Sequence, residues 1–275
     1  MNRVKGIRRY PLKSAAAEHP AEAEVGKHGL GGDRTWVCVD ADGTIGSAKQ
    51  PRLWARLLEV AVRYEPAQAD SEGRTIITAP GGEPCEAGTP EADAAVSAWL
   101  GRPVRVTRTA PQQLKRHHWW PDEPGMIPEW AADAEPGGDA VVDARPSSDG
   151  RFFDFGPMHL VTTGALDRLS TEHGEEVDPI RFRPNLILDL PADPEPGQRI
   201  TIGTDVVLEV AIATPRCVIP SLAHGDAPAD KALLKTLARH HRIEVPYGRA
   251  TCFGFYADVV ATGTVATGAE VRILP

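Results

Sequence analysis

Residues 205–219 organise this chain, and they read Asp205-Val206-Val207-Leu208-Glu209-Val210-Ala211-Ile212-Ala213-Thr214-Pro215-Arg216-Cys217-Val218-Ile219. The first eight are mostly β-branched or aliphatic, which predicts a buried strand. Cys217 is therefore expected where a strand ends and a loop begins, with Arg216 beside it. A neighbouring cation lowers the pKa of a thiol, and a strand end holds a side chain rigidly at a pocket rim. The alternative, a buried cysteine that only packs, stays open on this spacing alone.

The composition limits the partners of the protein. The chain has 275 residues, which suffices for one large domain or two smaller ones, and 41% of them are hydrophobic. Its formal net charge of −8 argues against binding to nucleic acid or to an anionic membrane through overall charge. Any site for an anion must therefore be a local cluster of basic residues.

The cysteines and the N-terminus predict a cytoplasmic protein. Cys38, Cys85, Cys217 and Cys252 form no CxxC pair, so neither a structural zinc site nor a thioredoxin-type motif is indicated. Four scattered cysteines in a long chain are typical of a reduced compartment. Residues 1–8 lack the apolar core of a signal peptide, and no run approaches the length of a membrane-spanning helix. We expect no membrane contact.

Many short β-rich runs with glycine and proline between them predict a mainly β, α+β fold of the barrel or sandwich kind. Few helices are expected. Thr89-Pro90-Glu91 is a helix start and Gly101 a helix stop, which predicts a helix between them. Two more helices are expected over residues 164–170 and after Asp230. The expected strands are 35–39, 44–45, 58–64, 75–78, 104–106, 161–163, 186–190, 200–202, 205–212, 257–261 and 270–274.

Residues 108–150 differ from the rest of the chain. Proline, glycine and acidic residues are dense there, which predicts a long irregular connection, such as a lid or a binding loop. Trp119 and Trp120 are expected to anchor this loop or to line a pocket entrance. His117 and His118 precede them, but adjacent loop histidines without partners are not expected to bind a metal.

Four segments place basic or hydroxyl groups at the ends of expected elements: residues 10–14, 29–36, 181–185 and 214–217. If the segments converge, they form a cationic pocket for a phosphate or another anion, in which arginine gives two-pronged contacts. The alternative for each arginine is an ordinary salt bridge with one of the 38 acidic residues. The candidate residues are Lys13, Ser14, Arg34, Thr163, Arg181, Arg183, Asn185, Thr214 and Arg216.

The same segments resemble the signatures of MOSC-domain proteins with a MOSC N-terminal β-barrel domain. This superfamily includes the molybdenum cofactor sulfurase C-terminal domain and the mitochondrial amidoxime-reducing component. The matching pieces, in chain order, are YPLKS (10–14), GLGGDRTW (29–36), PRL (51–53), RFRPN (181–185), TPRC (214–217) and FGFY (253–256). The resemblance implies an N-terminal β-barrel-like domain over residues 1–107, a connection over 108–150 and a MOSC core over 151–275.

The resemblance also implies a molybdenum cofactor, a pterin dithiolene with a terminal phosphate. Cys217 would be the protein ligand of the metal, because a soft thiolate suits a sulfur-ligated transition metal. The other cysteines would be structural. Cofactor contacts would come from Lys13, Ser14, Arg34, Thr163, Arg181, Arg183, Asn185 and Arg216.

The implied activity is an oxidoreductase that reduces N-oxygenated or related small molecules. Its electrons would come from a separate flavin or iron–sulfur protein, because the chain has no ferredoxin-like cysteine cluster. Two alternatives stay open: a cofactor-handling or sulfur-transfer protein that uses Cys217 as a thiolate or persulfide carrier, and a non-catalytic barrel that binds another anion. Three places depart from the family pattern: residue 15 is alanine, 191–198 lack a tryptophan, and 219–224 are not acidic.

Overall fold

One eight-stranded sheet forms the C-terminal half of the computed structural model, which describes residues 2–67, 73–109, 114–144, 147–148 and 150–274. Its strands are β1 (Val4–Ile7), β12 (Met158–Thr162), β13 (Leu186–Leu188), β14 (Arg199–Ile202), β15 (Val206–Pro215), β16 (Arg242–Val245), β17 (Gly248–Ala261) and β19 (Val271–Leu274). Their order is β1-β13-β12-β17-β15-β14-β19, with β16 paired to β17. The predicted strand 205–212 is the first part of β15, so Cys217 lies two residues beyond a central strand.

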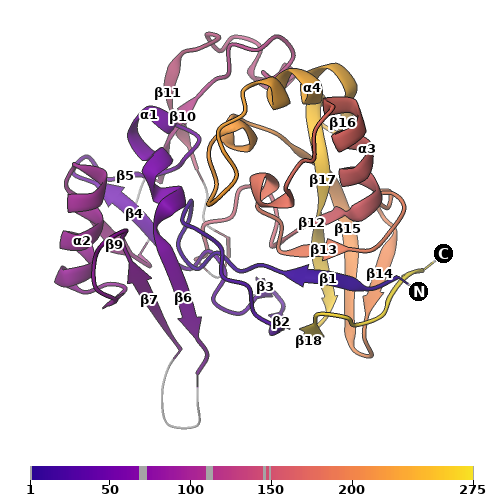
Figure 1. The fold of residues 1–275 in the computed structure, drawn as a ribbon, viewed down its shortest axis with the longest axis horizontal. Helices are drawn as coiled ribbons and strands as arrows, with labels where there is room; N and C mark the ends of the chain where they lie inside the picture. Colours follow the sequence, from indigo (N-terminus) through magenta and orange to yellow (C-terminus); the bar gives the residue numbers. More distant parts are fainter. Residues whose placement is uncertain (1, 68–72, 110–113, 145–146, 149, 275) are drawn as a thin grey trace.

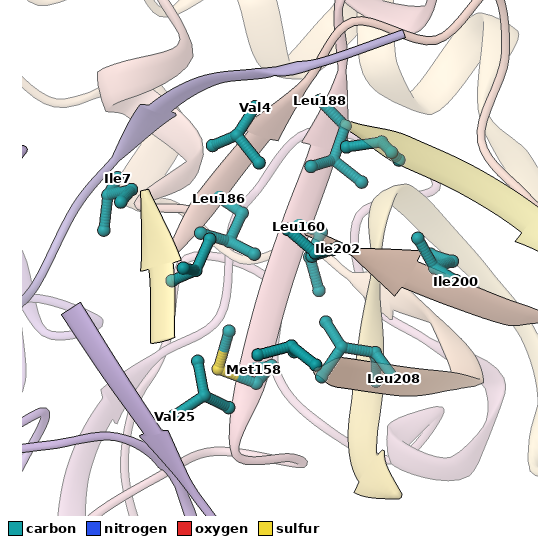
Figure 2. Packing of buried hydrophobic residues seen from close by; sticks show 14 of the residues in the cluster. Val4, Ile7, Val25, Met158, Leu160, Leu186, Leu188, Ile200, Ile202 and Leu208 are labelled. Atoms are coloured by element: carbon teal, nitrogen blue, oxygen red, sulfur yellow. The ribbon is translucent and has the colours of Figure 1, made fainter. Parts of the chain in front are cut away.

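The two ends of this sheet nearly meet. Arg3, beside β1, forms a β-bridge with Glu270, beside β19. The Val4 N–H donates to Ala269 O at 2.9 Å, and the Gly268 N–H donates to Val4 O at 2.8 Å. Figure 2 shows the apolar side chains that fill the interior, among them Leu160 and Leu208, which are fully buried. The sheet is thus a nearly closed barrel, and the mainly β class is confirmed.

Three smaller sheets accompany the barrel. The first has the order β11-β10-β5-β4-β9, the second β6-β7-β8, and the third β18-β2-β3. A second core, around the fully buried Trp54 and Leu57, lies under the first two. The bounds are β2 (Glu22–Gly26), β3 (Gly29–Leu30), β4 (Val37–Asp40), β5 (Thr44–Ile45), β6 (Ala61–Glu65), β7 (Arg74–Thr78), β8 (Cys85–Glu86), β9 (Val104–Thr107), β10 (Lys115–Trp119), β11 (Asp139–Asp143) and β18 (Gly263–Ala266).

The two halves exchange strands. β1 pairs antiparallel with β13, and β2 pairs antiparallel with β18, although the partners in each pair lie far apart in the sequence. In Figure 1 the chain starts in the barrel sheet with β1 and passes from there to the smaller sheets. The segments that carry residues 10–14 and 29–36 are therefore held against the barrel, and not against the N-terminal sheets alone.

The described residues include four α-helices, two in each half (Figure 1). Thr89 caps α2 by accepting a hydrogen bond from the Ala92 N–H, and Gly101 ends it with φ of 68°, which confirms the predicted start and stop. The helices expected near 164–170 and after Asp230 are also present. The bounds are α1 (Pro51–Trp54), α2 (Pro90–Leu100), α3 (Thr163–His173) and α4 (Ala232–His240), with 3₁₀ turns at Ala55–Glu59, Glu129–Ala131, Pro179–Phe182 and Ile219–Ser221.

Two expectations need correction. The strand predicted over 58–64 begins only at Ala61, because residues 55–59 form a 3₁₀ turn. The segment 108–150 is not wholly irregular: β10 and β11 pair in register from Lys115↔Asp143 to Trp119↔Asp139, and β10 joins β5. β10 alternates poorly in polarity, since it reads Lys-Arg-His-His-Trp, so its sequence gave no period-2 signal.

Candidate functional site

A basic groove lies where the four segments meet, and Lys13, Arg34, Arg181, Arg183 and Cys217 all line it, as predicted. Among its described lining residues six are basic and one, Asp154, is acidic, in a chain whose net charge is −8. The lining of the groove therefore carries an excess of positive charge. Its remaining basic residues are Lys49 and Arg216.

The backbone of this groove is strained at three positions. Ser14, Arg34 and Arg183 have φ of 66°, 50° and 55°, and they are the non-glycine residues with positive φ in the described part of the chain. All three line the groove. Left-handed conformations cost free energy for residues other than glycine, and such strain gathers at functional sites. The surrounding fold therefore holds these side chains in orientations that the local sequence alone does not favour.

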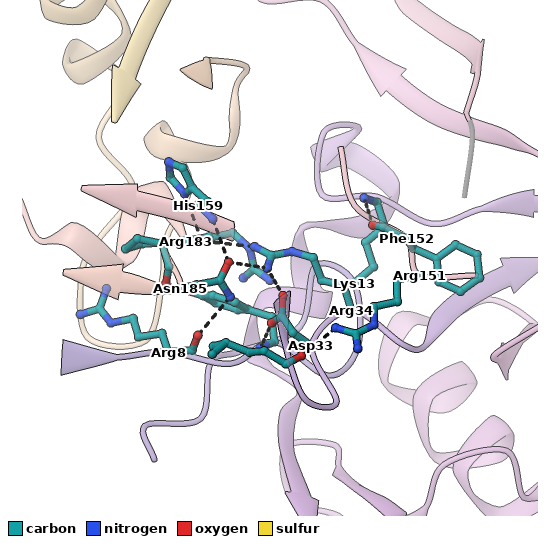
Figure 3. Close-up of polar contacts among 12 residues, drawn as sticks. Arg8, Lys13, Asp33, Arg34, Arg151, Phe152, His159, Arg183 and Asn185 are labelled. Carbon is teal, nitrogen blue, oxygen red and sulfur yellow. Dashed lines mark hydrogen bonds and ion pairs between the residues drawn. The ribbon is translucent and has the colours of Figure 1, made fainter. Parts of the chain in front are cut away.

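Tyr10 organises two of the arginines. Its ring is fully buried, and the guanidinium carbons of Arg183 and Arg34 lie 4.2 and 4.9 Å from the ring centroid. Arg34 also pairs with Asp33, whose other carboxylate oxygen accepts from the Tyr10 N–H at 2.7 Å. Figure 3 shows Arg34 and Asp33, from the first half of the chain, beside Arg183 and Asn185 from the second. The Tyr10 ring thus positions both guanidinium groups, and the Asp33 carboxylate additionally holds that of Arg34.

Arg183 keeps most of its donors for a ligand. Its Nη1 donates to Ala15 O at 2.6 Å, and its side chain is buried. Burial lowers the Arg183 pKa to about 10, which still leaves it charged near neutral pH. A buried, charged arginine with one acceptor among the described residues is well suited to hold an oxyanion.

Asp154 collects three cations at one wall of the groove. Its carboxylate accepts from Lys13 at 3.0 Å and from Lys49 at 2.9 Å, and it lies 3.3 Å from Arg116. Burial alone would raise the Asp154 pKa, but the three cations outweigh burial and hold it well below its usual range. Burial lowers the Lys13 pKa to about 8, against the opposing effect of Asp154. Within this cluster three cations share one carboxylate, which leaves an excess of positive charge.

Arg216 and His159 fix the approach to Cys217. Arg216 donates to the carbonyl oxygens of Phe253 and Phe182, and its Nη2 also donates to His159 Nε2. His159 Nδ1 lies 3.4 Å from Arg183 O, so the ring is neutral with its proton on Nδ1. Burial, followed by the charge of Arg216, keeps the His159 pKa well below its usual range. Arg216 is therefore a clamp that ties the end of β15 to β17.

Cys217 is the only one of the four cysteines that lines the groove, where it is half-buried. Cys38 and Cys252 are buried, and burial raises their pKa values to about 12 and about 11. The Cys85 thiol donates to Glu83 O at 3.4 Å, away from the groove. Cys217 therefore is the thiol that a ligand in the groove can reach.

Two of the predicted cofactor contacts lie outside the groove and bond to other parts of the protein. Thr163 lies outside the groove, and its hydroxyl bonds to Asp189 at 3.2 Å. Asn185 is fully buried and also outside the groove; its amide oxygen accepts from Arg34 Nη1 at 3.2 Å and from the His159 N–H at 3.0 Å. Residue type alone does not show which neighbour a hydroxyl or an amide will choose.

Arg181 and Ser14 line the groove, but both make protein contacts. Arg181 donates to three carbonyl oxygens, those of Pro220, Leu222 and Pro228. It therefore holds the loop that follows Cys217. The Ser14 hydroxyl accepts from the Ala48 N–H at 3.0 Å and remains able to donate.

Of the two roles expected for the tryptophans, lining the entrance is not seen, since neither lines the groove. Trp119 does anchor the loop, because its indole N–H donates to Gly137 O at 2.8 Å. The backbone N–H of Trp119 donates to Lys49 O at 2.8 Å, so β10 supports the part of the groove that Lys49 lines. Sequence reasoning also missed several groove residues. Two signals were available: Lys49 lies two residues before the PRL signature, and Tyr256 closes the FGFY piece. Asp154, Phe155 and His159 had none.

The groove fits an anionic cofactor with a sulfur-seeking metal. The buried Thr214 hydroxyl, three residues before Cys217, lines the groove and has no hydrogen-bond partner among the described residues. It is a donor left for a ligand. The deep part of the groove encloses only about 60 Å³, so a pterin would extend into the open groove or into the neighbouring cavity of about 300 Å³, which shares Lys13 and Asp154. In the described part of the chain no three His, Cys, Asp or Glu residues form a metal site by themselves.

Comparison with known proteins identifies both halves. A model of the MOSC domain matches residues 148–272, and a model of the MOSC N-terminal β-barrel domain matches residues 1–110. A search of curated proteins gave no match. Among the residues that the structure describes, no helix has the length and apolar character needed to cross a membrane.

Two solved structures are similar at a distance. The YUAD protein from Bacillus subtilis is 12% identical with a TM-score of 0.46, over 99% of this chain and 96% of that chain. YiiM from Geobacillus stearothermophilus is 19% identical with a TM-score of 0.30, over 43% of this chain and 54% of that chain. Neither score is high enough to inform function. The two family matches do inform it: this chain belongs to the MOSC-domain proteins that carry a MOSC N-terminal β-barrel domain.

Proposed function

We propose that the protein is a molybdenum-cofactor-dependent oxidoreductase that reduces N-oxygenated or related small molecules. MOSC domains are associated with this cofactor in general. The observation that carries the proposal is that a reachable thiol, Cys217, shares one groove with six basic residues. A thiolate suits a soft metal, and the cations suit the phosphate of the cofactor.

The residues divide into three roles. Cys217 would ligate the metal. Arg183, Arg34 and the Lys13–Lys49 pair would hold the anionic part, with Thr214 and Ser14 as hydrogen-bond donors. Arg181 and Arg216 act through the backbone, since they position the loop after Cys217 and the end of β15. When bound, the cofactor supplies two-electron chemistry at its metal.

The overall reaction needs two electrons and two protons for each N–O bond broken. An N-hydroxylated substrate then gives the N–H compound and one water. A separate flavin or iron–sulfur protein would supply the electrons. Lys13 is a candidate to hold one proton near the groove, because burial lowers its pKa to about 8. Its Nζ lies 3.0 Å from Asp154 Oδ1.

One feature favours a second candidate, sulfur transfer. Cys217 is half-buried and follows Arg216, a setting that also suits a persulfide carrier. One measurement on the purified protein, its molybdenum and pterin content, distinguishes the two functions. Stoichiometric metal and pterin, with reduction of an N-hydroxylated substrate by a chemical reductant, support the oxidoreductase. A cofactor-free protein that accumulates a Cys217 persulfide, seen by mass spectrometry, contradicts it.

A further inference from the structure

A row of aromatic rings leads from the protein surface into the basic groove. Tyr247, Trp130 and Phe155 are 63%, 40% and 51% exposed. The Trp130 ring lies edge-to-face with Tyr247 at 6.3 Å and with Phe155 at 6.4 Å between centroids. Phe155 in turn lies 6.1 Å from Tyr256, which lines the groove. Large aromatic side chains exposed to this degree in one contiguous row mark a binding surface.

The rings are held in place by their neighbours. Trp130 lies in the 3₁₀ turn Glu129–Ala131, and Glu129 Oε2 accepts from the Arg249 N–H at 2.8 Å. Arg249 lies in β17, just after the turn that carries Tyr247. Phe155 follows Asp154, which three cations fix. The row is thus pre-organised, so a ligand would lose little free energy in ordering it.

The size of the row fits a small molecule better than a protein. An aromatic side chain offers roughly 150–250 Å², so three half-exposed rings present on the order of 300 Å². A stable protein partner needs about 800 Å² on each side. An area of this size can cover both faces of one flat ring, and aromatic rings prefer offset or edge-to-face neighbours.

We infer that Trp130, Phe155 and Tyr247 form a platform that selects substrates with a flat aromatic ring and directs their N-oxygenated end toward Cys217. Phe155 lines the groove itself, so a ring resting on it has its polar end at the groove mouth. The inference rests on the proposed function and adds the class of substrate. Trp130 and Tyr247 line neither the groove nor the neighbouring cavity, so their replacement is expected to leave cofactor binding intact.

The test uses two N-oxides that differ in the ring: pyridine N-oxide and trimethylamine N-oxide. Their Kd values are measured by ligand-observed NMR on the protein as purified, without reductant, so that no turnover occurs. Phe155→Leu and Trp130→Leu are each expected to raise the Kd for pyridine N-oxide at least fivefold. The Kd for trimethylamine N-oxide should rise less than twofold. Phe155→Tyr, which keeps the ring, is expected to retain the original Kd.

Ile273→Ala is the matched control, because Ile273 is 39% exposed on β19 and outside the row. Molybdenum and pterin content are measured on every variant. Equal affinity for the two N-oxides, or unchanged affinity in both leucine variants, overturns the platform whatever the metal content. The platform is also overturned if the variants are no longer reduced by a protein electron donor while their Kd for pyridine N-oxide stays unchanged. The aromatic row would then be a docking face for that protein. Absence of molybdenum from all samples instead contradicts the proposed function, while the Kd values still decide the platform.

Discussion

The guanidinium of Arg183 lies over the ring of Tyr10, with 4.2 Å between the guanidinium carbon and the ring centroid, although 173 positions separate them in the sequence. The same ring lies 4.9 Å from the guanidinium carbon of Arg34. One buried tyrosine from the first signature segment therefore aligns arginines from the second and the third. The spacing of the cations in the groove depends on this contact.

Tyr10→Leu is expected to lower the free energy of unfolding by about 2–4 kcal/mol, because it removes a buried ring. It should also reduce the bound molybdenum, since both guanidinium groups lose their support. Tyr10→Phe keeps the ring and loses only the hydrogen bond to Pro184 O at 3.3 Å, which is worth about 1 kcal/mol. Urea unfolding and metal analysis measure the two effects. If both variants lost the same amount of stability and of bound molybdenum, the hydroxyl and not the ring would be the group that positions the arginines.

Cys217→Ser is expected to abolish turnover and to lower molybdenum retention, while most of the pterin stays bound. A serine hydroxyl is a harder donor and stays protonated near neutral pH, so it replaces a thiolate poorly on a soft metal. Lys13 and the arginines still hold the anionic end. Cys38→Ser is the control, and it should change stability alone because Cys38 is buried in a β-strand. Full metal and full turnover in Cys217→Ser would exclude the cysteine as ligand.

Arg183→Met and Arg181→Met form a second matched pair, because both residues line the groove and both are buried. Arg183→Met should lose pterin and molybdenum together, with normal reactivity of the Cys217 thiol. Arg181→Met should lower the free energy of unfolding by about 2–4 kcal/mol, since three carbonyl oxygens lose their donor. Unfolding curves and pterin fluorescence separate the outcomes. The role assignment fails if Arg181→Met loses the cofactor and Arg183→Met keeps it.

Lys13 gives a prediction about pH. Its ordinary pKa is 10.5, and burial lowers it to about 8 in the folded protein. Between these values the unfolded chain binds one more proton at Lys13 than the folded chain does, so the free energy of unfolding rises with pH in this window. Below about pH 8 both states are protonated, and the cost of burying the charge is constant.

The Lys13→Met variant isolates this effect, because all other groups titrate in both proteins. The stability of the original protein relative to the variant should rise by up to about 3 kcal/mol from pH 8 to pH 10.5. Urea unfolding at several pH values measures the difference. A difference that does not change with pH would mean that Lys13 titrates at its ordinary pKa in the folded state.

Local signals in the sequence predicted local structure well. The helix over residues 90–100 follows from Thr89, Pro90 and Gly101, because capping chemistry acts within a few residues. β15 follows from a run of β-branched and aliphatic residues. The polarity pattern did not predict β10, because this strand is held by its pairing with β11 and β5 and has no alternating apolar face.

The groove residues could be predicted from the sequence only where they lie in or beside a signature segment. Resemblance brought Lys13, Arg34, Arg183 and Cys217 together, and the structure confirms that they share one groove. Asp154 could not be found, because its partner Lys13 lies 141 positions away and no local pattern marks such a pair. The same limit explains Thr163: a hydroxyl at a helix start has several possible acceptors, and only the tertiary fold decides among them.

The shared strand β1 imposes an order on synthesis. Its partner β13 emerges from the ribosome about 180 residues later, which is roughly 10–40 s at ordinary rates of translation. During this interval one edge of β1 has no strand to pair with. The strand spans only four residues, and a bulge leaves the exposed Lys5 between Val4 and Gly6. Short length, a charge and a bulge are the features that keep an open edge from pairing with another chain, so the nascent protein carries its own protection until the barrel can close.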